Sequence, residues 1–373
     1  MKVGEFRKYT DALARFATTR EKAQGIESLV GVQKKGNTLK LISGNSRAGM
    51  VVTVEEFSGD TGDFSYVVPA RPLLQASKVL PTKASITLYA QRDGLHIQAE
   101  GGGMFDIGDL GMSLRDAGFP KKPKKFRVKG ELDAETLKRI AKLFKNVSAK
   151  VEVPCVRIVN GTAYAIAVAP GERPMYVNYR FDATSAEGDD DEYSMAGYRD
   201  FWEGLTHFTE SGTIYWGRDG ILVRSANAEC YSAPYLVSSW DEKTRTAGPP
   251  EEQVPWPIMV AIDKSDVAIT VKRKVLSDAV KSQAPFDEHN RVTLEANAGS
   301  LRVSPFGSSD GMDIESEAKG KGIRSVNADH LLTLLNAMDT KDVTLRWSGG
   351  VPAISISAED YRSWTILLAP VAL

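Results

Sequence analysis

The chain has 373 residues, of which 42% are hydrophobic, 25% charged and 8% aromatic, and its formal net charge is −1. These values are typical of an ordinary soluble protein that is long enough for two or three domains. No apolar run approaches the roughly 18 residues that a membrane span needs, and the first residues contain no hydrophobic signal segment, so we expect a cytoplasmic protein without a membrane partner. Cys155 and Cys230 are too few and too widely spaced to indicate a disulfide framework or a zinc site.

Two kinds of helix-plus-strand segment alternate along the chain. The first kind is an amphipathic helix, with apolar side chains at helical spacing, followed by short alternating strands. Its helices are predicted over residues 4–20, 133–147 and 271–284, and its strands over 36–43, 156–168 and 292–303. The second kind starts at Tyr66, Tyr193 and Ser325, and each copy reads as a helix of about three turns, a strand, a turn and a second strand.

The alternation repeats with a period of about 125 residues, which is too long for a solenoid, whose units span roughly 20 to 50 residues. It predicts three similar domains, residues 1–122, 123–247 and 248–373, each made of two helix-plus-antiparallel-sheet halves. Because such a helix must bury one apolar stripe against one face of its sheet, the predicted fold class is α+β. Proline-rich segments at 120–125 and 241–257 are the expected joints, and the acidic run 187–192 is expected to be a solvated loop.

The small net charge hides an uneven distribution. It is +4, −1 and −4 over the three predicted domains, and the six predicted helices together carry +8, which leaves −9 for the rest of the chain. Plain solvated helix faces would carry Glu as often as Lys or Arg, and Glu is scarce here, so we favour a phosphate-directed, sequence-independent nucleic-acid interface. The predicted contacts are Arg7, Arg15, Arg20, Arg71, Lys78, Lys138, Arg139, Lys142, Lys145, Arg273, Lys274 and Lys281.

The last fifth of the chain resembles a known family. Residues 326–347 read VNADHLLTLLNAMDTKDVTLRW, and residues 361–373 read YRSWTILLAPVAL. With the three-domain organisation and the basic helices, these segments resemble the bacterial DNA polymerase sliding clamp, the β-type processivity factor, whose last domain has a Leu-rich helix and an apolar tail. Residues 153–156 (VPCV) are similar to the strand that opens the family's middle domain. Residues 167–174 and the opening of the third domain depart from the family pattern, which indicates a divergent member, with a phage as one candidate source.

The resemblance implies a DNA-clamp fold of three domains that closes head to tail with a second copy, a homodimeric ring around double-stranded DNA. It also implies a role in DNA replication, in which the ring tethers a DNA polymerase for processive synthesis and is placed on DNA by a clamp loader. Such a protein is not an enzyme, and we expect no catalytic residues, no metal and no cofactor.

The resemblance further implies a pocket between the second and third domains that receives short peptides from partner proteins. Its residues would be Val156, Ala169, Gly171, Arg173, Pro174, Asn327, His330, Val351, Leu367, Leu368, Pro370 and Val371. Ordinary core packing is the alternative for the apolar members, and a plain position on a helix surface is the alternative for His330. The uncharged tail 367–373 would form one wall of the pocket, with docking into the core of its own domain as the alternative.

Two functions of other classes stay open. The chain lacks the Walker A, HExxH and GxSxG motifs, and its four histidines are scattered, so an enzyme would need a site assembled from distant residues. The other alternative is a clamp-fold interaction scaffold that does not encircle DNA. A closed ring in solution or on DNA would distinguish a clamp from such a scaffold.

Overall fold

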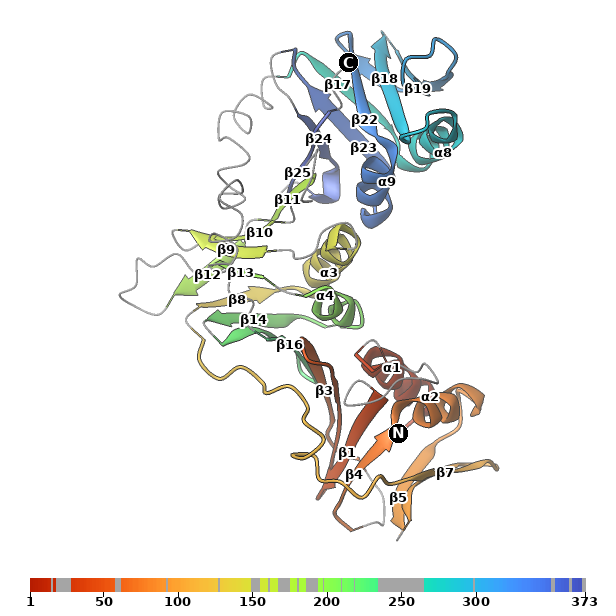
Figure 1. The fold of residues 1–373 in the computed structure, drawn as a ribbon, viewed down its shortest axis with the longest axis vertical. Coiled ribbons are helices and arrows are strands. Elements are labelled where there is room, and N and C mark those ends of the chain that lie inside the picture. Colours follow the sequence, from red (N-terminus) through yellow and green to blue (C-terminus); the bar gives the residue numbers. More distant parts are fainter. Residues whose placement is uncertain are drawn as a thin grey trace. The chain divides into compact units, whose positions relative to one another are not determined.

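The structure is a computed structural model, and its ribbon is drawn in Figure 1. It describes residues 1–14, 16–17, 28–57, 62–91, 93–126, 128–148, 155–159, 162–166, 175–179, 181–185, 194–196, 198–208, 210–217, 219–233, 265–297, 299–349, 353–361 and 364–370. The chain divides into two compact units. The first contains Met1–Ala141, Ala183–Asp189 and Gly197–Tyr235, and the second contains Lys142–Asp182, Asp190–Ala196 and Leu236–Leu373.

Each of the six α-helices in the described part of the chain is followed by three strands, and we call such a segment a module. The first three modules are α1 (Val3–Leu13) with β1 (Leu29–Lys35), β2 (Thr38–Gly44) and β3 (Ala48–Val54); α2 (Ala70–Val79) with β5 (Ile86–Gln91), β6 (Gly94–Ala99) and β7 (Met104–Gly108); and α3 (Ala134–Ser148) with β9 (Cys155–Val159), β10 (Thr162–Ile166) and β11 (Met175–Tyr179). The last three are α4 (Arg199–Leu205) with β14 (Gly212–Gly217), β15 (Gly220–Arg224) and β16 (Ala228–Ser232); α8 (Arg273–Gln283) with β18 (Arg291–Asn297), β19 (Ser300–Pro305) and β20 (Met312–Glu315); and α9 (Ala328–Ala337) with β23 (Asp342–Trp347), β24 (Ile354–Ser357) and β25 (Trp364–Leu368).

These modules confirm the predicted alternation of helices and antiparallel strands. The remaining strands are β4 (Phe64–Pro69), β8 (Val128–Leu132), β12 (Phe181–Ser185), β13 (Ser194–Ala196), β17 (Val267–Lys272), β21 (Glu317–Lys319) and β22 (Gly322–Asn327). The first helix is shorter than predicted, because α1 ends at Leu13 and not near residue 20. The acidic run 187–192 and the joint 241–257 lie outside the described residues.

In the first unit, antiparallel strands follow the order β8-β14-β15-β16-β3-β2-β1-β4, and β5-β6-β7 form a separate sheet. The step from β16 to β3 joins two modules that are far apart in the sequence, with Cys230 opposite Met50 in the register. Helices α1 and α2 lie side by side in Figure 1, and a buried hydrogen bond of 2.9 Å joins Thr10 Oγ1 and Ser77 Oγ between them.

In the second unit, one sheet has the order β11-β25-β24-β23-β17-β21 and another the order β20-β19-β18-β22. In the first of these sheets, β11 pairs with β25, which belongs to another module, and Val177 lies opposite Ile366. A third group pairs β13 with β9, β9 with β10 and β10 with β12.

Apolar side chains at helical and alternating spacing build the core. Phe6 and Leu13 on α1, Leu73 on α2, Leu276 on α8 and Leu331 on α9 are at most 2% exposed. Burying each of these side chains contributes about 1.5–3 kcal/mol relative to leaving it in water. The periodic apolar positions therefore fix one face of each helix against its sheet, and the opposite face stays in solvent.

The basic, proline-containing joint between the first two predicted domains lies across a sheet face, without helix or strand of its own. A Cβ at Gly44 would lie 2.5 Å from Pro120 Cδ, and a Cβ at Gly49 would lie 2.9 Å from Pro120 Cγ, so glycine at these positions leaves room for the joint. The Tyr231 hydroxyl donates a hydrogen bond of 2.9 Å to the Pro120 carbonyl. Lys122 Nζ also pairs with Glu229 Oε2 at 2.6 Å.

Candidate nucleic-acid interface

The predicted DNA-binding cations lie on α1, α2, α3 and α8, as far as the structure describes them. Arg71, Lys78, Lys138, Lys274 and Lys281 are exposed, and Arg7, Arg139, Lys142, Lys145 and Arg273 are partly buried. Arg15 and Arg20 lie outside the described residues. Five of the predicted contacts are therefore displayed on helix surfaces, where phosphate groups could reach them.

Two of the predicted arginines make structural contacts at helix ends. Arg7 on α1 donates hydrogen bonds of 2.9, 3.0 and 3.1 Å to the carbonyls of Ser77, Lys78 and Leu80. These carbonyls lie at the C-terminal end of α2, where helical hydrogen bonding leaves acceptors without a partner and the helix dipole is negative. The sequence offered no signal for this contact, because it joins residues about seventy positions apart.

Arg273 on α8 plays the same part at the end of α9. Its guanidinium donates to the Leu335 carbonyl at 3.1 Å and to the Thr340 carbonyl at 2.8 Å. In both helix pairs, α1 with α2 and α8 with α9, an arginine on the first helix donates to carbonyls at the C-terminal end of the second helix. Arg139 on α3 makes a third kind of contact, an ion pair with Glu135 one helical turn earlier.

The described members of the predicted peptide pocket have clear structural roles. Asn327 is the N-cap of α9, and its side-chain oxygen accepts a hydrogen bond of 3.1 Å from the His330 backbone N–H. Leu367 and Leu368 belong to β25 and are 3% and 0% exposed. His330 and Pro370 are partly buried.

The peptide pocket itself cannot be assembled from the described residues. Val156 lies on β9, where it pairs with Ala165 and Met195. Ala169, Gly171, Arg173, Pro174, Val351 and Val371 lie outside the described residues. The burial of Leu367 and Leu368 shows that the beginning of the tail packs in its own sheet, so these two leucines have a core role whether or not a peptide binds nearby.

The third strand of each module behaves in one of two ways. Strands β3 and β16 pair with each other, and β11 and β25 do the same. Within the described residues, β7 pairs only with β6, and β20 pairs only with β19. We call β7 and β20 the open edges and the two paired sets the closed junctions.

Exposed apolar side chains gather beside both open edges. Met104 on β7 is 57% exposed, and Val79 at the end of the adjacent α2 is 67% exposed. Near β20, Met312 is 46% exposed, and Phe286, just beyond α8, is 76% exposed. Apolar groups at an unpaired strand edge are typical of a surface that another chain covers.

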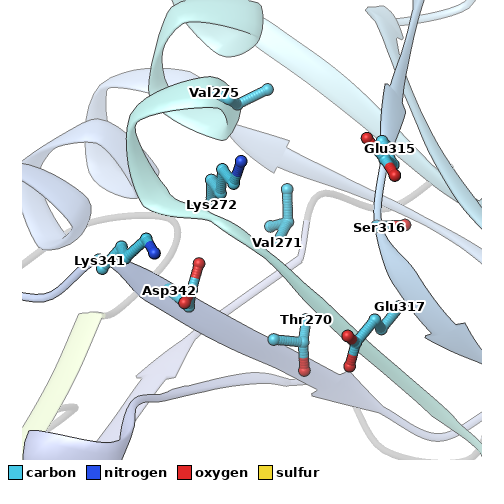
Figure 2. Close-up of a pocket in the computed structure, with 9 residues that line it drawn as sticks. All are labelled: Thr270, Val271, Lys272, Val275, Glu315, Ser316, Glu317, Lys341 and Asp342. Atoms are coloured by element: carbon cyan, nitrogen blue, oxygen red, sulfur yellow. The ribbon is translucent and has the colours of Figure 1, made fainter.

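A pocket of about 450 Å³ lies next to the β20 edge, between β17, the start of α8 and the crossing from β20 to β21. Figure 2 shows Lys272 and Lys341 on one side of it and Glu315 and Glu317 on the other. The hydroxyl of Ser316 lies buried at this crossing without a hydrogen-bond partner in the structure. The pocket therefore offers apolar surface from Val275, charged groups of both signs and one buried hydroxyl without a hydrogen-bond partner, at the end of an open edge.

No protein-family model matches the chain, and neither does any curated protein sequence. Solved structures do match over its whole length. A DnaN sliding clamp (DNA polymerase III subunit beta) from Pseudomonas aeruginosa, bound to griselimycin, superposes with a TM-score of 0.73 at 17% identity, covering 100% of this chain and 98% of that one. The DNA polymerase III beta subunit of Thermotoga maritima superposes with a TM-score of 0.71 at 14% identity, covering 100% and 98%.

This chain has the fold of a bacterial β sliding clamp. The Helicobacter pylori beta clamp bound to a DNA ligase peptide has the same fold, with a TM-score of 0.71, 15% identity and coverage of 100% and 99%. The clamp fold explains why six similar modules follow one another in a single chain. It confirms the α+β class and the likeness first seen in the C-terminal fifth of the sequence. Among the described helices, none has the length and apolar character of a membrane span.

Proposed function

We propose that two copies of this chain close head to tail into a sliding clamp that encircles duplex DNA and tethers a DNA polymerase for processive synthesis. The observation that carries the proposal is the pair of open edges. Four of the six third strands are already paired in closed junctions, and β7 and β20 are the two that have no such partner within the described chain. Pairing β7 of each copy with β20 of the other would give every third strand a partner.

The closed junctions supply the pattern for this contact. In both of them, two third strands pair antiparallel over five residues. At one end of the β3–β16 junction, the Thr53 N–H also donates a hydrogen bond of 2.8 Å to the Asn227 carbonyl in the turn before β16. The corresponding turn before β7 is Gly101–Gly103, which would reach the end of β20 beside the pocket of Figure 2. We expect this turn to provide partners for the polar groups there.

The ring would consist of six domains, if each chain contributes the three predicted from its repeats (1–122, 123–247 and 248–373). The exposed helix cations Arg71, Lys78, Lys138, Lys274 and Lys281 would then hold the phosphate backbone without reading bases. Such contacts bind DNA and still let the ring slide, which a base-specific site would prevent. No step of this function requires catalysis or a cofactor.

Partner proteins would bind by short peptides, as the structure of the Helicobacter pylori clamp with a DNA ligase peptide illustrates for that protein. We propose a replicative DNA polymerase and a clamp loader as the partners of this chain. The pocket residues stay as predicted from the family resemblance, with Leu367 and Leu368 contributing through the sheet that they build rather than as exposed anchors.

A clamp-fold scaffold that does not encircle DNA is the second candidate. It is favoured by the engagement of Arg7 and Arg273 in helix-end contacts, which removes two cations from the set available to DNA. The two candidates differ in topology, so a topological experiment separates them.

The test has two parts. Size-exclusion chromatography with light scattering at micromolar concentration should give the mass of a dimer. After loading onto nicked circular DNA, with a clamp loader if one is needed, the protein should stay bound in high salt and leave when the DNA is linearised. A monomer that binds circular and linear DNA equally would support the scaffold and contradict the clamp.

A further inference from the structure

A buried histidine lies between two carboxylates beside the open edge β7. His96 lies on β6, its side chain is 5% exposed, and its ring stacks on Tyr89 with 5.4 Å between centroids and 16° between planes. Its Nε2 lies 3.2 Å from Asp93 Oδ1, in the turn before β6. Its Nδ1 makes a short contact with Asp106 Oδ1, on β7. We call Asp93, His96 and Asp106 the histidine bridge.

The histidine bridge is complete only when the imidazole is protonated. Ionised carboxylates only accept hydrogen bonds, and a neutral imidazole has one N–H to donate, whereas an imidazolium has two. The hydrogen bond from His96 lowers the pKa of Asp93, so that carboxyl group stays ionised. The titratable groups beside this site on neighbouring segments include the phenols of Tyr89 on β5 and Tyr66 on β4, whose hydroxyl donates to the Gln91 carbonyl. Asp109, directly after β7, is a third: its backbone N–H donates to the Asp93 carbonyl, and its carboxylate accepts from the Val67 N–H. No described cation replaces the imidazolium there.

The closed junctions carry uncharged pairs at the corresponding positions. His96 is the third residue of β6 and lies opposite Tyr89 and Asp106. The third residue of β15, Leu222, lies opposite Tyr215 and Tyr231 in the module that forms the β3–β16 junction.

In the module that ends in β25, the third residue of β24, Ile356, lies opposite Leu345 and Ile366. Of the three positions, only the one at an open edge combines a histidine with carboxylates.

We propose that the histidine bridge is a proton-dependent latch that favours closure of the ring between β7 of one copy and β20 of the second copy. This inference rests on the proposed head-to-tail dimer. With His96 protonated, Asp106 is held against β6 and one negative charge of the bridge is neutralised. When the proton leaves, two carboxylates flank a neutral ring, and across the closed interface they meet Glu315, which is exposed on the β20 edge, and Asp313, whose carboxylate pairs with Arg302 at 2.8 Å. Like charges brought together at an interface weaken association.

The test measures the dissociation constant of the dimer between about pH 5.5 and about pH 8, the range in which imidazoles change charge. Sedimentation equilibrium or mass photometry at fixed ionic strength provides the constant. The dimer of the unaltered chain should weaken by roughly three- to tenfold as the pH rises, which is the scale of one ordinary net hydrogen bond. His96→Gln, which keeps a donor and does not titrate, should flatten this response.

Two further variants serve as controls for the role of His96. His289→Gln changes an exposed histidine of the second unit, paired with Glu288, and should keep the pH response of the unaltered chain. Asp106→Asn keeps an acceptor for His96 and removes one carboxylate, so its dimer should be tighter than that of the unaltered chain at the high-pH end.

The possible results separate the two proposals. A dimer whose affinity is the same at every pH, or whose pH response survives His96→Gln, overturns the latch and leaves the clamp standing. A protein that stays monomeric at every pH overturns the clamp and, with it, the role of the histidine bridge in closure.

Discussion

The β3–β16 closed junction and the β20 open edge show the same architectural position in two states. Phe16 lies three residues beyond the end of α1, and Phe286 lies three residues beyond the end of α8. Phe16 is 2% exposed, because it packs against α4, where a Cβ on Gly204 would lie 2.4 Å from its Cζ atom. Phe286 is 76% exposed. The aromatic side chain at this position is buried at the closed junction (Phe16) and exposed at the open edge (Phe286). This difference indicates that another chain covers the open edge.

The difference between the two regions indicates that different residues control the stability of the fold and the assembly of the dimer. Residues at closed junctions should control the free energy of unfolding, residues at open edges should control the dissociation constant of the dimer, and helix-surface cations should affect neither. The following changes test these assignments.

The largest effect is expected on DNA binding, from helix-surface lysines that take no part in either type of junction. A variant with Lys78→Gln, Lys138→Gln, Lys274→Gln and Lys281→Gln should bind duplex DNA about a hundredfold more weakly near 0.1 M salt and show a shallower salt dependence. Fluorescence anisotropy with two unrelated duplexes measures this, and the loss should be equal for both. The matched control carries the same charge change at exposed sheet and loop positions, Lys35, Lys40, Lys319 and Lys321. Equal loss in the control would mean that binding depends on total charge and not on the helices.

The open edge should respond next. Phe286→Ser removes an exposed aromatic group that would become a buried anchor on ring closure, so the dimer should weaken by about thirtyfold, the scale of an interface hot spot. Urea unfolding of the monomer should be unchanged, because the side chain contacts little within its own chain. A dimer of normal affinity would show that Phe286 lies outside the interface.

The closed junction should show the reverse behaviour. Gly204→Ala places a methyl group within 2.4 Å of Phe16 Cζ and 3.1 Å of Cys230 Sγ. Overpacking of this kind costs about 1–3 kcal/mol of the free energy of unfolding. Urea denaturation measures that loss, and the dissociation constant of the remaining folded dimer should not change. If the dimer weakened while unfolding stayed the same, closed and open junctions would not be separable in this way.

The smallest effect is expected from Arg7. Arg7→Gln loses the hydrogen bonds to the end of α2 and should lower the free energy of unfolding by about 1 kcal/mol. Lys8→Gln is the matched control, since Lys8 is the neighbouring exposed cation on the same helix, and it should leave stability unchanged. DNA affinity should fall no more for Arg7→Gln than for Lys8→Gln. A larger fall for Arg7→Gln would show that Arg7 contacts DNA.

Much of the fold could be predicted from the sequence, because helix faces and strand alternation are local signals. The repeat of helices and strands and the likeness of the C-terminal fifth were sufficient to indicate the clamp fold. The end of α1 could not be placed, because Phe16 continues the apolar spacing although the helix stops at Leu13.

The candidate site was less predictable, because its decisive contacts join distant parts of the chain. Charge counting placed Arg7 and Arg273 with the DNA-binding residues, yet both donate to carbonyls about sixty to seventy positions away. The uncharged tail predicted docking of residues 367–373, but whether Leu367 and Leu368 face a groove or a core depends on the pairing of β25 with β11 and β24. The histidine bridge likewise depends on strand register, which no spacing rule gives.

The most direct test of the ring is a cross-link between the open edges of two copies. Antiparallel pairing places the start of β7 opposite the end of β20, so Met104→Cys and Glu315→Cys in one chain, with Cys155 and Cys230 replaced by Ser, should be joined by a short bismaleimide. A closed ring should give a covalent dimer with two cross-links. Once closed around nicked circular DNA, this dimer should resist high salt and denaturant and be released when the DNA is linearised. The ring would be contradicted by cross-links formed only within one chain or by a series of higher oligomers. It would also be contradicted by a cross-linked dimer that leaves circular DNA as easily as linear DNA.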